Sequence, residues 1–187
     1  MRIIAGEYKG RRLMTPENSD IRPTSDKVRE AIFNLLMYDI EGAVCADVFS
    51  GTGSLGLEAL SRGADFCWFS DNDRKSIALI KANIAACKAE DRAQVTAGDY
   101  MKGLRRIDGK IDIFFIDPPY GAGLYEKCFA EIENLDLLSE DGIIVAEHDS
   151  RTELPHNTGR LTMFRERRYG KILVSLYSKA GMEDMRD

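Results

Sequence analysis

The chain has 187 residues, of which 44% are hydrophobic and 30% are charged, and its formal net charge at pH 7 is −5. These values are ordinary for a soluble globular protein, and we expect one compact domain over residues 1–187; the chain shows no internal repeat or low-complexity tract. No apolar run is long enough to span a bilayer, and we expect no secretory leader. Four dispersed cysteines and two isolated histidines indicate free thiols in a reducing cytoplasm and no metal site.

The first 38 residues predict a β-hairpin followed by a helix. Segments 2–5 and 11–14 flank a loop that contains two glycines, which is typical of a hairpin. A polar, turn-rich connector follows over residues 16–23. Thr24 or Ser25 can then cap a helix whose apolar residues fall on one face: Val28, Ala31, Ile32, Leu35 and Leu36.

From residue 39 to residue 180 the pattern alternates between strands and helices. Strands are predicted at 43–49, 66–70, 93–97, 111–116 and 143–148, and helices at 55–62, 73–88, 99–106 and 123–134. This alternation indicates an α/β fold with a parallel sheet and right-handed crossovers. Segments 161–168 and 172–178 predict an antiparallel hairpin that closes the sheet.

A glycine-rich loop follows the first strand of this alternation. Gly51, Gly53 and Gly56 match G-x-G-x-x-G between a strand and a helix. Asp71 lies twenty residues after Gly51, at the end of the next strand, where a carboxylate can accept hydrogen bonds from ribose hydroxyls. The pattern therefore predicts a site for a nucleoside-containing cofactor. The alternative is that the glycines only permit a tight turn.

Asp47 indicates which cofactor this is. A carboxylate just before the glycines would repel a pyrophosphate, but it can pair with the ammonium group of an amino acid. S-adenosyl-L-methionine carries such an ammonium group, a ribose and an adenine, and it has no phosphate. We extend its predicted site to Phe49, Asn72, Gly98 and Asp99. Asp99 can accept a hydrogen bond from the adenine amine, and it can equally cap the following helix.

A second candidate site is Asp117-Pro118-Pro119-Tyr120, which follows the apolar strand 111–116. Ligands of open α/β sheets bind at the ends of such strands. The Asp117 carboxylate and the Pro118 carbonyl can accept both N–H groups of an exocyclic amine, and the prolines make the loop rigid. Tyr120 can stack on a planar base. The sequence therefore predicts methyl transfer to an amine, although Pro-Pro alone can also mark a simple turn.

The chain resembles the RsmD-type bacterial methyltransferases nearly end to end. The likeness rests on the glycine loop, on Asp117-Pro118-Pro119-Tyr120, and on residues 2–6, 9–13, 22–34 and 165–171. It implies a Rossmann-like, seven-stranded methyltransferase sheet over 39–180, in which the last strand inserts beside the fifth, with an N-terminal hairpin and helix extension over 1–38. It also implies that S-adenosyl-L-methionine methylates guanine N2 in small-subunit ribosomal RNA. Asp71 stands where the family more often has Glu.

The distribution of charge is consistent with an RNA partner. Residues 1–29 hold seven basic and four acidic residues, and residues 160–171 hold five basic residues and one acidic residue. Arg11, Arg12, Arg22 and Lys27 are the predicted RNA-docking residues of the 1–38 region. Free RNA or an assembling small ribosomal particle would be the partner, and ordinary solvated charge is the alternative.

The residues leave other reactions open. Methylation of adenine N6 or of a protein glutamine would use the same carboxylate and proline. A nucleotide-binding module would need the glycine loop but not Asp117-Pro118-Pro119-Tyr120, and Asp47 argues against an NAD-dependent oxidoreductase. Glu147 and His148 follow the fifth predicted strand, where each could line the site or belong to the edge of the core.

Overall fold

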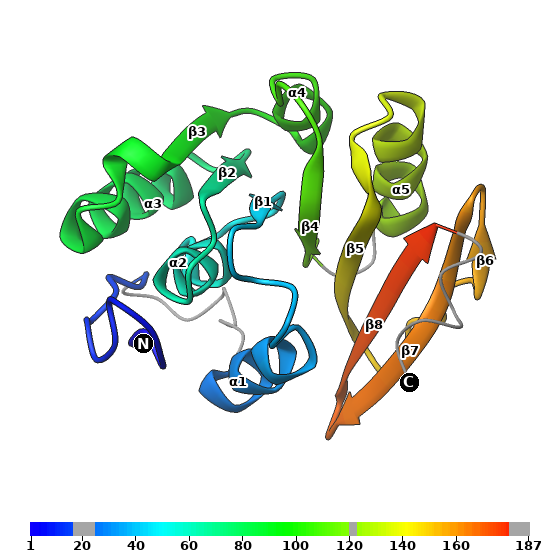
Figure 1. The fold of residues 1–187 in the computed structure, drawn as a ribbon, viewed down its shortest axis with the longest axis horizontal. Coiled ribbons are helices and arrows are strands. Elements are labelled where there is room, and N and C mark those ends of the chain that lie inside the picture. Colours follow the sequence, from blue (N-terminus) through cyan, green and yellow to red (C-terminus); the bar gives the residue numbers. More distant parts are fainter. Residues whose placement is uncertain (17–24, 120–122, 180–187) are drawn as a thin grey trace.

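The computed structural model describes residues 1–16, 25–119 and 123–179, and its centre is one mixed β-sheet (Figure 1). The strand order is β3-β2-β1-β4-β5-β8-β7-β6. The first five strands pair in parallel: β1 (Val44–Asp47), β2 (Phe66–Asp71), β3 (Ala93–Ala97), β4 (Ile111–Ile116) and β5 (Leu138–Asp149). The last three are antiparallel: β6 (Asn157–Thr158), β7 (Leu161–Tyr169) and β8 (Ile172–Lys179).

The predicted α/β fold is confirmed, including the insertion of the last strand beside the fifth. The resemblance implied seven strands, and the sheet has eight because the two-residue strand β6 pairs with the start of β7. The predicted strand 143–148 is too short, since β5 begins at Leu138. The polar residues 139–142 hid its first part, where the pairing with β4 is also irregular.

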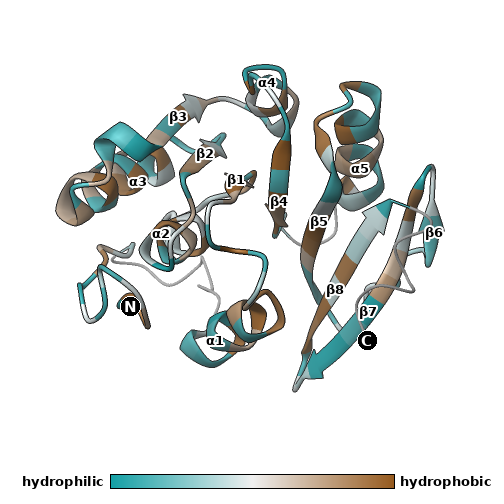
Figure 2. Ribbon diagram, viewed as in Figure 1, coloured by the Kyte–Doolittle hydropathy of each residue, from teal (hydrophilic) through white to brown (hydrophobic). Residues whose placement is uncertain are grey.

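Helices cover both faces of the sheet (Figure 1). α1 (Asp26–Leu35), α2 (Ser54–Ser61) and α3 (Arg74–Cys87) pack in one core with the sheet. α4 (Tyr100–Leu104) and α5 (Leu124–Asn134) pack in a second core on the other face. In Figure 2 the side of α5 that faces the sheet is brown and its outer side is teal. Because both faces are covered, a central strand such as β4 has apolar residues on both faces instead of alternating, apart from the half-buried Asp112, which accepts a hydrogen bond from the Val44 N–H.

The N-terminal hairpin prediction is correct only in part. The two segments pair in antiparallel fashion at the isolated bridge Arg2 to Arg12, where the Ile3 N–H donates to Arg11 and the Leu13 N–H to Met1, but the pairing is too short for either segment to form a strand. The reason is that the N–H groups of Ile4 and Ala5 donate to the side chain of Glu58, at 2.8 and 3.0 Å, instead of to a neighbouring strand. The segment is therefore anchored on α2 rather than extended as a ribbon.

The predicted caps and thiols agree with the structure where it describes them. Ser25 caps α1 by accepting a hydrogen bond from the Val28 N–H, while Thr24 lies outside the described residues. All four cysteines are buried and free. None of the helices in the described ranges combines the length and apolarity that a membrane span requires.

Candidate active site at the carboxyl ends of the strands

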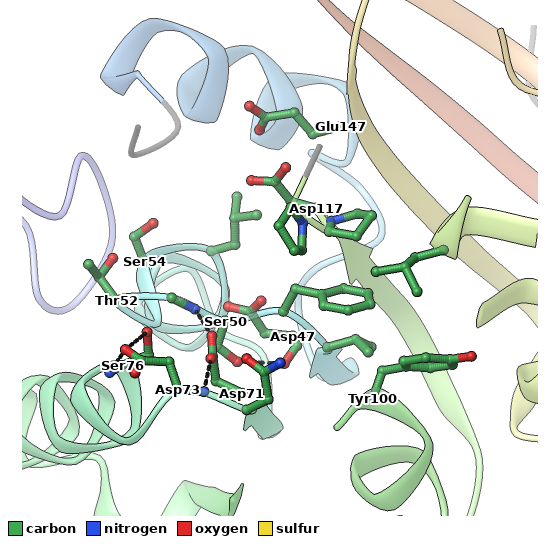
Figure 3. A pocket seen from close by; sticks show the side chains of 18 of the residues that line it. Asp47, Ser50, Thr52, Ser54, Asp71, Asp73, Ser76, Tyr100, Asp117 and Glu147 are labelled. Atoms are coloured by element: carbon green, nitrogen blue, oxygen red, sulfur yellow. Dashed lines mark hydrogen bonds between the residues drawn. The ribbon is translucent and has the colours of Figure 1, made fainter. Parts of the chain in front are cut away.

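A cavity of about 530 Å³ opens at the carboxyl ends of the parallel strands (Figure 3). This volume is within the range of sites for small molecules and cofactors. Its walls come from the glycine loop after β1, the ends of β2 and β3, the loop after β4, the first turns of α1 to α5, and single residues of β5 and β8. Ten of the predicted site residues line it: Asp47, Phe49, Gly51, Asp71, Asn72, Gly98, Asp99, Asp117, Pro118 and, among the two left open, Glu147.

The glycine loop turns the chain from β1 into α2. Gly53 is the N-cap of α2 and has a left-handed conformation, with φ of 75°, which favours glycine. It shapes the turn and is not among the residues that line the cavity. A side chain at Gly56 would lie 2.3 Å from the ring of Phe69, so this glycine allows α2 to pack closely on β2.

Asp47 is a buried carboxyl group beneath this loop. One of its oxygens accepts a hydrogen bond from the Gly56 N–H at 3.1 Å. Burial raises the pKa of Asp47 to about 7, an effect that the Gly56 hydrogen bond opposes and the nearby Asp71 carboxylate reinforces. A cationic group placed beside Asp47 would restore its charged form. The position therefore suits a ligand ammonium group.

Asp71 fixes two loops at the end of β2. Its Oδ2 accepts a hydrogen bond from the Gly51 N–H, and its Oδ1 accepts one from the Asp73 N–H, both at 2.8 Å. Each carboxylate oxygen keeps a second lone pair, so the side chain can still accept hydrogen bonds from a ligand in the cavity. Its suggested part in ribose binding remains a prediction.

An aromatic wall lies beside these carboxylates. The rings of Phe49 and Tyr100 are 5.8 Å apart and both residues line the cavity, next to Asn72 and Gly98. Asp99 caps α4, because its Oδ1 accepts a hydrogen bond from the Lys102 N–H at 2.8 Å. The capping alternative for Asp99 is confirmed, and its predicted contact with an adenine stays untested.

The loop after β4 forms the opposite end of the cavity. Figure 3 shows the carboxyl groups of Asp117 and Glu147 there, away from Asp71 and Asp73. Burial raises the pKa of Asp117 well above its ordinary value, and the charges of Glu147 and Asp47 raise it further. Pro118 is buried in the wall. Tyr120, predicted to stack on a base, lies outside the described residues.

Glu147 and His148 point to opposite faces of β5. Glu147 lines the cavity, whereas His148 is buried elsewhere and does not line it. The His148 Nδ1 lies 3.0 Å from the Thr152 carbonyl oxygen and its Nε2 lies 2.8 Å from the Ser175 hydroxyl. The question left open by the sequence is thus resolved by strand alternation: Glu147 belongs to the cavity and His148 to the core.

The lining of the cavity is acidic. It holds six carboxyl groups and, among the described residues, no lysine, arginine or histidine: Asp47, Asp71, Asp73, Asp99, Asp117 and Glu147. Within the described ranges, no three His, Cys, Asp or Glu side chains are grouped as they would be around a metal ion. Such a lining favours a cationic organic ligand and disfavours phosphate groups.

The predicted RNA-docking residues lie outside the cavity. Arg12 and Lys27 are exposed, and Arg22 lies outside the described residues. Arg11 is also exposed, but its guanidinium donates a hydrogen bond to the Ala86 carbonyl in the last turn of α3. A cation in that position stabilises a helix, so Arg11 has a structural contact that the sequence did not reveal.

The structure adds residues that the sequence did not indicate. The cavity is also lined by Ser25, the N-cap of α1, by Val28 of α1, Tyr100 of α4, Leu124 of α5 and Ile172 of β8. Their positions depend on how distant segments pack together, so no local motif could have identified them.

The fold and the cavity define the class of the protein, that of the Rossmann-like methyltransferases. A solved structure titled "Putative methyltransferase yhhF from Escherichia coli" matches with a TM-score of 0.85 and 34% identity, covering 96% of this chain and 97% of that one. Its fold agrees with the present one along nearly the whole length of both chains.

Sequence comparison gives the family. A family model described as "Conserved hypothetical protein 95" matches residues 1–178. The "Ribosomal RNA small subunit methyltransferase D" of Escherichia coli (strain K12) is 35% identical over 179 residues, covering 96% of this chain and 90% of the relative. A Bacillus subtilis (strain 168) protein named "Putative rRNA methyltransferase YlbH" is 40% identical over 184 residues, covering 97% of this chain and 100% of the relative. The chain belongs to the RsmD family of ribosomal RNA methyltransferases.

Proposed function

We propose that the protein transfers a methyl group from S-adenosyl-L-methionine to the exocyclic N2 amine of a guanine in small-subunit ribosomal RNA. The observation that carries the proposal is the position of Asp117 and Pro118, which face the same cavity as Asp47 and the glycine loop. One cavity thus contains an acceptor for an amine and a site for a cationic methyl donor. Relatives named as small-subunit methyltransferases support the choice of RNA.

The cofactor fits the cavity by the charge and the chemistry of the groups that line it. S-adenosyl-L-methionine supplies an activated, positively charged methyl donor when it is bound. Asp47 would pair with its ammonium group, Asp71 would accept from the ribose hydroxyls, and Phe49 with Asp99 would hold the adenine. A dinucleotide would bring a pyrophosphate into a lining of six carboxyl groups, which costs electrostatic energy.

The protein's part in the reaction is to position the amine and to receive its proton. The Asp117 carboxylate and the Pro118 carbonyl oxygen would accept its two N–H groups, so that the nitrogen lone pair faces the methyl donor. Positive charge then develops on the nitrogen, and a carboxylate at hydrogen-bond distance stabilises it. The proton then leaves to the Asp117 carboxylate or to water. Tyr120 would stack on the base, flipped out of the RNA.

The test is nucleoside mass spectrometry of small-subunit RNA after reaction with purified protein. Free RNA and partly assembled small particles should both be tried, from cells that lack the protein. The expected product is N2-methylguanosine at a single site. Methyl label on adenine N6, or on a protein glutamine, would contradict the proposal while leaving the family assignment intact.

We also propose that residues 1–38 dock the RNA beside the catalytic core, residues 39–180. Arg12 is exposed and Arg11 is held at the end of α3, so the adjacent arginines offer a matched comparison. Arg12→Ala should lower the slope of log Kd against log salt by about 0.7–0.9, the value for one lost phosphate contact. Arg11→Ala should instead reduce stability by about 0.3–1 kcal/mol. Filter binding at several salt concentrations checks the first result and chemical denaturation the second.

Neither variant should alter the affinity for S-adenosyl-L-methionine, because neither arginine lines the cavity. An unchanged salt slope for Arg12→Ala would show that this arginine is solvated surface charge.

A further inference from the structure

The second basic segment, residues 165–171, lies at the turn between β7 and β8 and has no part in the site described so far. Figure 2 shows the end of β7 in teal, and Ile172, the first residue of β8, lines the cavity. The segment therefore ends next to a residue of the cavity wall. The register of the sheet shows which basic residues of this segment lie on the same face as the cavity.

Arg167 lies in the same row of the sheet as the cavity residue Glu147. Val174 of β8 pairs with Glu147 on one side and with Arg167 on the other. Directly opposed residues of antiparallel strands project from the same face, and neighbouring strands are about 4.8 Å apart, so Arg167 is roughly 10 Å from Glu147 along this row. A guanidinium at that distance from the cavity is within reach of the backbone of a nucleotide whose base enters it.

Arg168 has the same charge but lies on the opposite face. Its row is His148, Leu173 and Arg168, and His148 is buried away from the cavity. The neighbouring Glu166 confirms this assignment of faces, since its carboxylate accepts a hydrogen bond at 3.0 Å from Ser175, which also contacts His148. Adjacent arginines therefore differ in the face from which they project.

Both arginines have cationic groups available to a ligand. Arg167 Nη1 donates to the Glu166 carbonyl and Arg168 Nε donates to the Gly170 carbonyl, each at 3.0 Å. Both side chains are exposed, and neither forms an ion pair with another residue in the described part of the chain. A guanidinium has five N–H donors and binds phosphate in bidentate fashion, so each could hold a phosphate if one were in reach.

We propose that Arg167 binds a backbone phosphate of the RNA strand next to the nucleotide whose base enters the cavity. This inference rests on the proposed function, because it takes RNA as the substrate. It also accounts for how a polyanion approaches an acidic cavity: the carboxyl groups repel phosphates, and a cation at the rim on the cavity face compensates. Arg168, on the other face, has no such phosphate to bind.

The competing explanation is protection of a sheet edge. The outer side of β7 pairs with β6 only at Leu161 and Thr162, and charged side chains commonly prevent such open edges from aggregating. Arg167 and Arg168 lie on the same open edge and would serve that purpose equally. The two explanations therefore predict different outcomes for the two residues.

The experiment compares Arg167→Ala with Arg168→Ala in the full-length protein. RNA affinity is measured by filter binding at several salt concentrations, and methylation kinetics use small-subunit RNA. Arg167→Ala should weaken RNA binding about tenfold, flatten the salt slope by about 0.7–0.9 and raise the KM for RNA. Arg168→Ala should match the unaltered protein in RNA affinity, in salt slope and in the KM for RNA. Both variants should keep the original affinity for S-adenosyl-L-methionine, and both should remain equally monodisperse.

Equal losses in the two variants, or no loss in either, would overturn the role of Arg167. Aggregation of both variants without loss of RNA affinity would overturn it in favour of edge protection. The proposed function fails separately, if the unaltered protein produces no N2-methylguanosine. Guanine methylation by the unaltered protein together with unaltered RNA binding by Arg167→Ala would leave the function standing and remove only this inference.

Discussion

Replacing Asp117 with alanine should lower the single-turnover rate of methyl transfer by at least about 10²–10³-fold, while the affinity for S-adenosyl-L-methionine stays within a few-fold. The reason is the division of the cavity: Asp117 lies with Glu147 at one end, and Asp47 and Asp71 lie by the glycine loop. Removing Asp117 takes away an acceptor for the amine and a carboxylate that stabilises the developing charge. Rapid-quench kinetics with labelled cofactor, together with calorimetry of cofactor binding, measures both quantities.

The matched control for Asp117→Ala is Asp71→Ala, which removes a carboxylate from the other end of the cavity. It should weaken cofactor binding by about 1–3 kcal/mol, because the ribose hydroxyl of the cofactor loses a charged acceptor. The Gly51 N–H also loses the Asp71 carboxylate as its hydrogen-bond acceptor. If Asp117→Ala methylated RNA within a few-fold of the original rate, the mechanism proposed for the amine would be wrong. A loss of cofactor affinity in Asp117→Ala as large as in Asp71→Ala would contradict the separation of the two ends.

Much of the fold and of the candidate site could be predicted because the residues of each motif are close together in the sequence. The apolar strand β4 and the loop after it are contiguous, and the glycine loop lies between a strand and a helix that each have a clear pattern. In an α/β sheet the ends of parallel strands meet at one edge, so two motifs seventy residues apart could be assigned to one site. The structure does place Asp47 and Asp117 in one cavity.

Other features could not be predicted, for physical reasons. β5 is buried on both faces, so the apolar run before Glu147 and His148 does not alternate and gives no sign of which side chain faces the cavity. The absence of strands in the N-terminal hairpin has a different cause, a contact between residues far apart in the sequence. Hairpin patterns assume that backbone N–H groups pair with another strand, and here the carboxylate of Glu58, more than fifty residues away, accepts two of them.

Glu58 is the centre of a buried ionic network that joins the N-terminal region to the cofactor-binding core. Besides the two N–H groups, its carboxylate accepts a hydrogen bond from Arg62 Nε at 2.9 Å and lies 3.7 Å from Arg29 Nε. Both Arg29 and Glu58 are fully buried. Burial lowers the pKa of the Arg29 guanidinium, and the charges of Glu58 and Asp26 oppose this shift. Arg29 itself donates to the Arg2 carbonyl, so α1, α2 and the N-terminal segment meet at this point.

Glu58→Ala should therefore destabilise the protein by about 3–5 kcal/mol, because it leaves a buried guanidinium without its main counter-charge and two backbone N–H groups without an acceptor. The free energy of unfolding in urea measures the effect. Glu140→Ala is the control: Glu140 also binds a cation, Lys179, but its side chain is 85% exposed, so its removal should change the free energy of unfolding far less than Glu58→Ala does. Limited proteolysis of Glu58→Ala should cut first within residues 1–16, where the anchor is lost. A cost near that of the control would mean that the N-terminal segment is held mainly by its apolar contacts, Ile3, Tyr8 and Leu13, and that the ionic network contributes little.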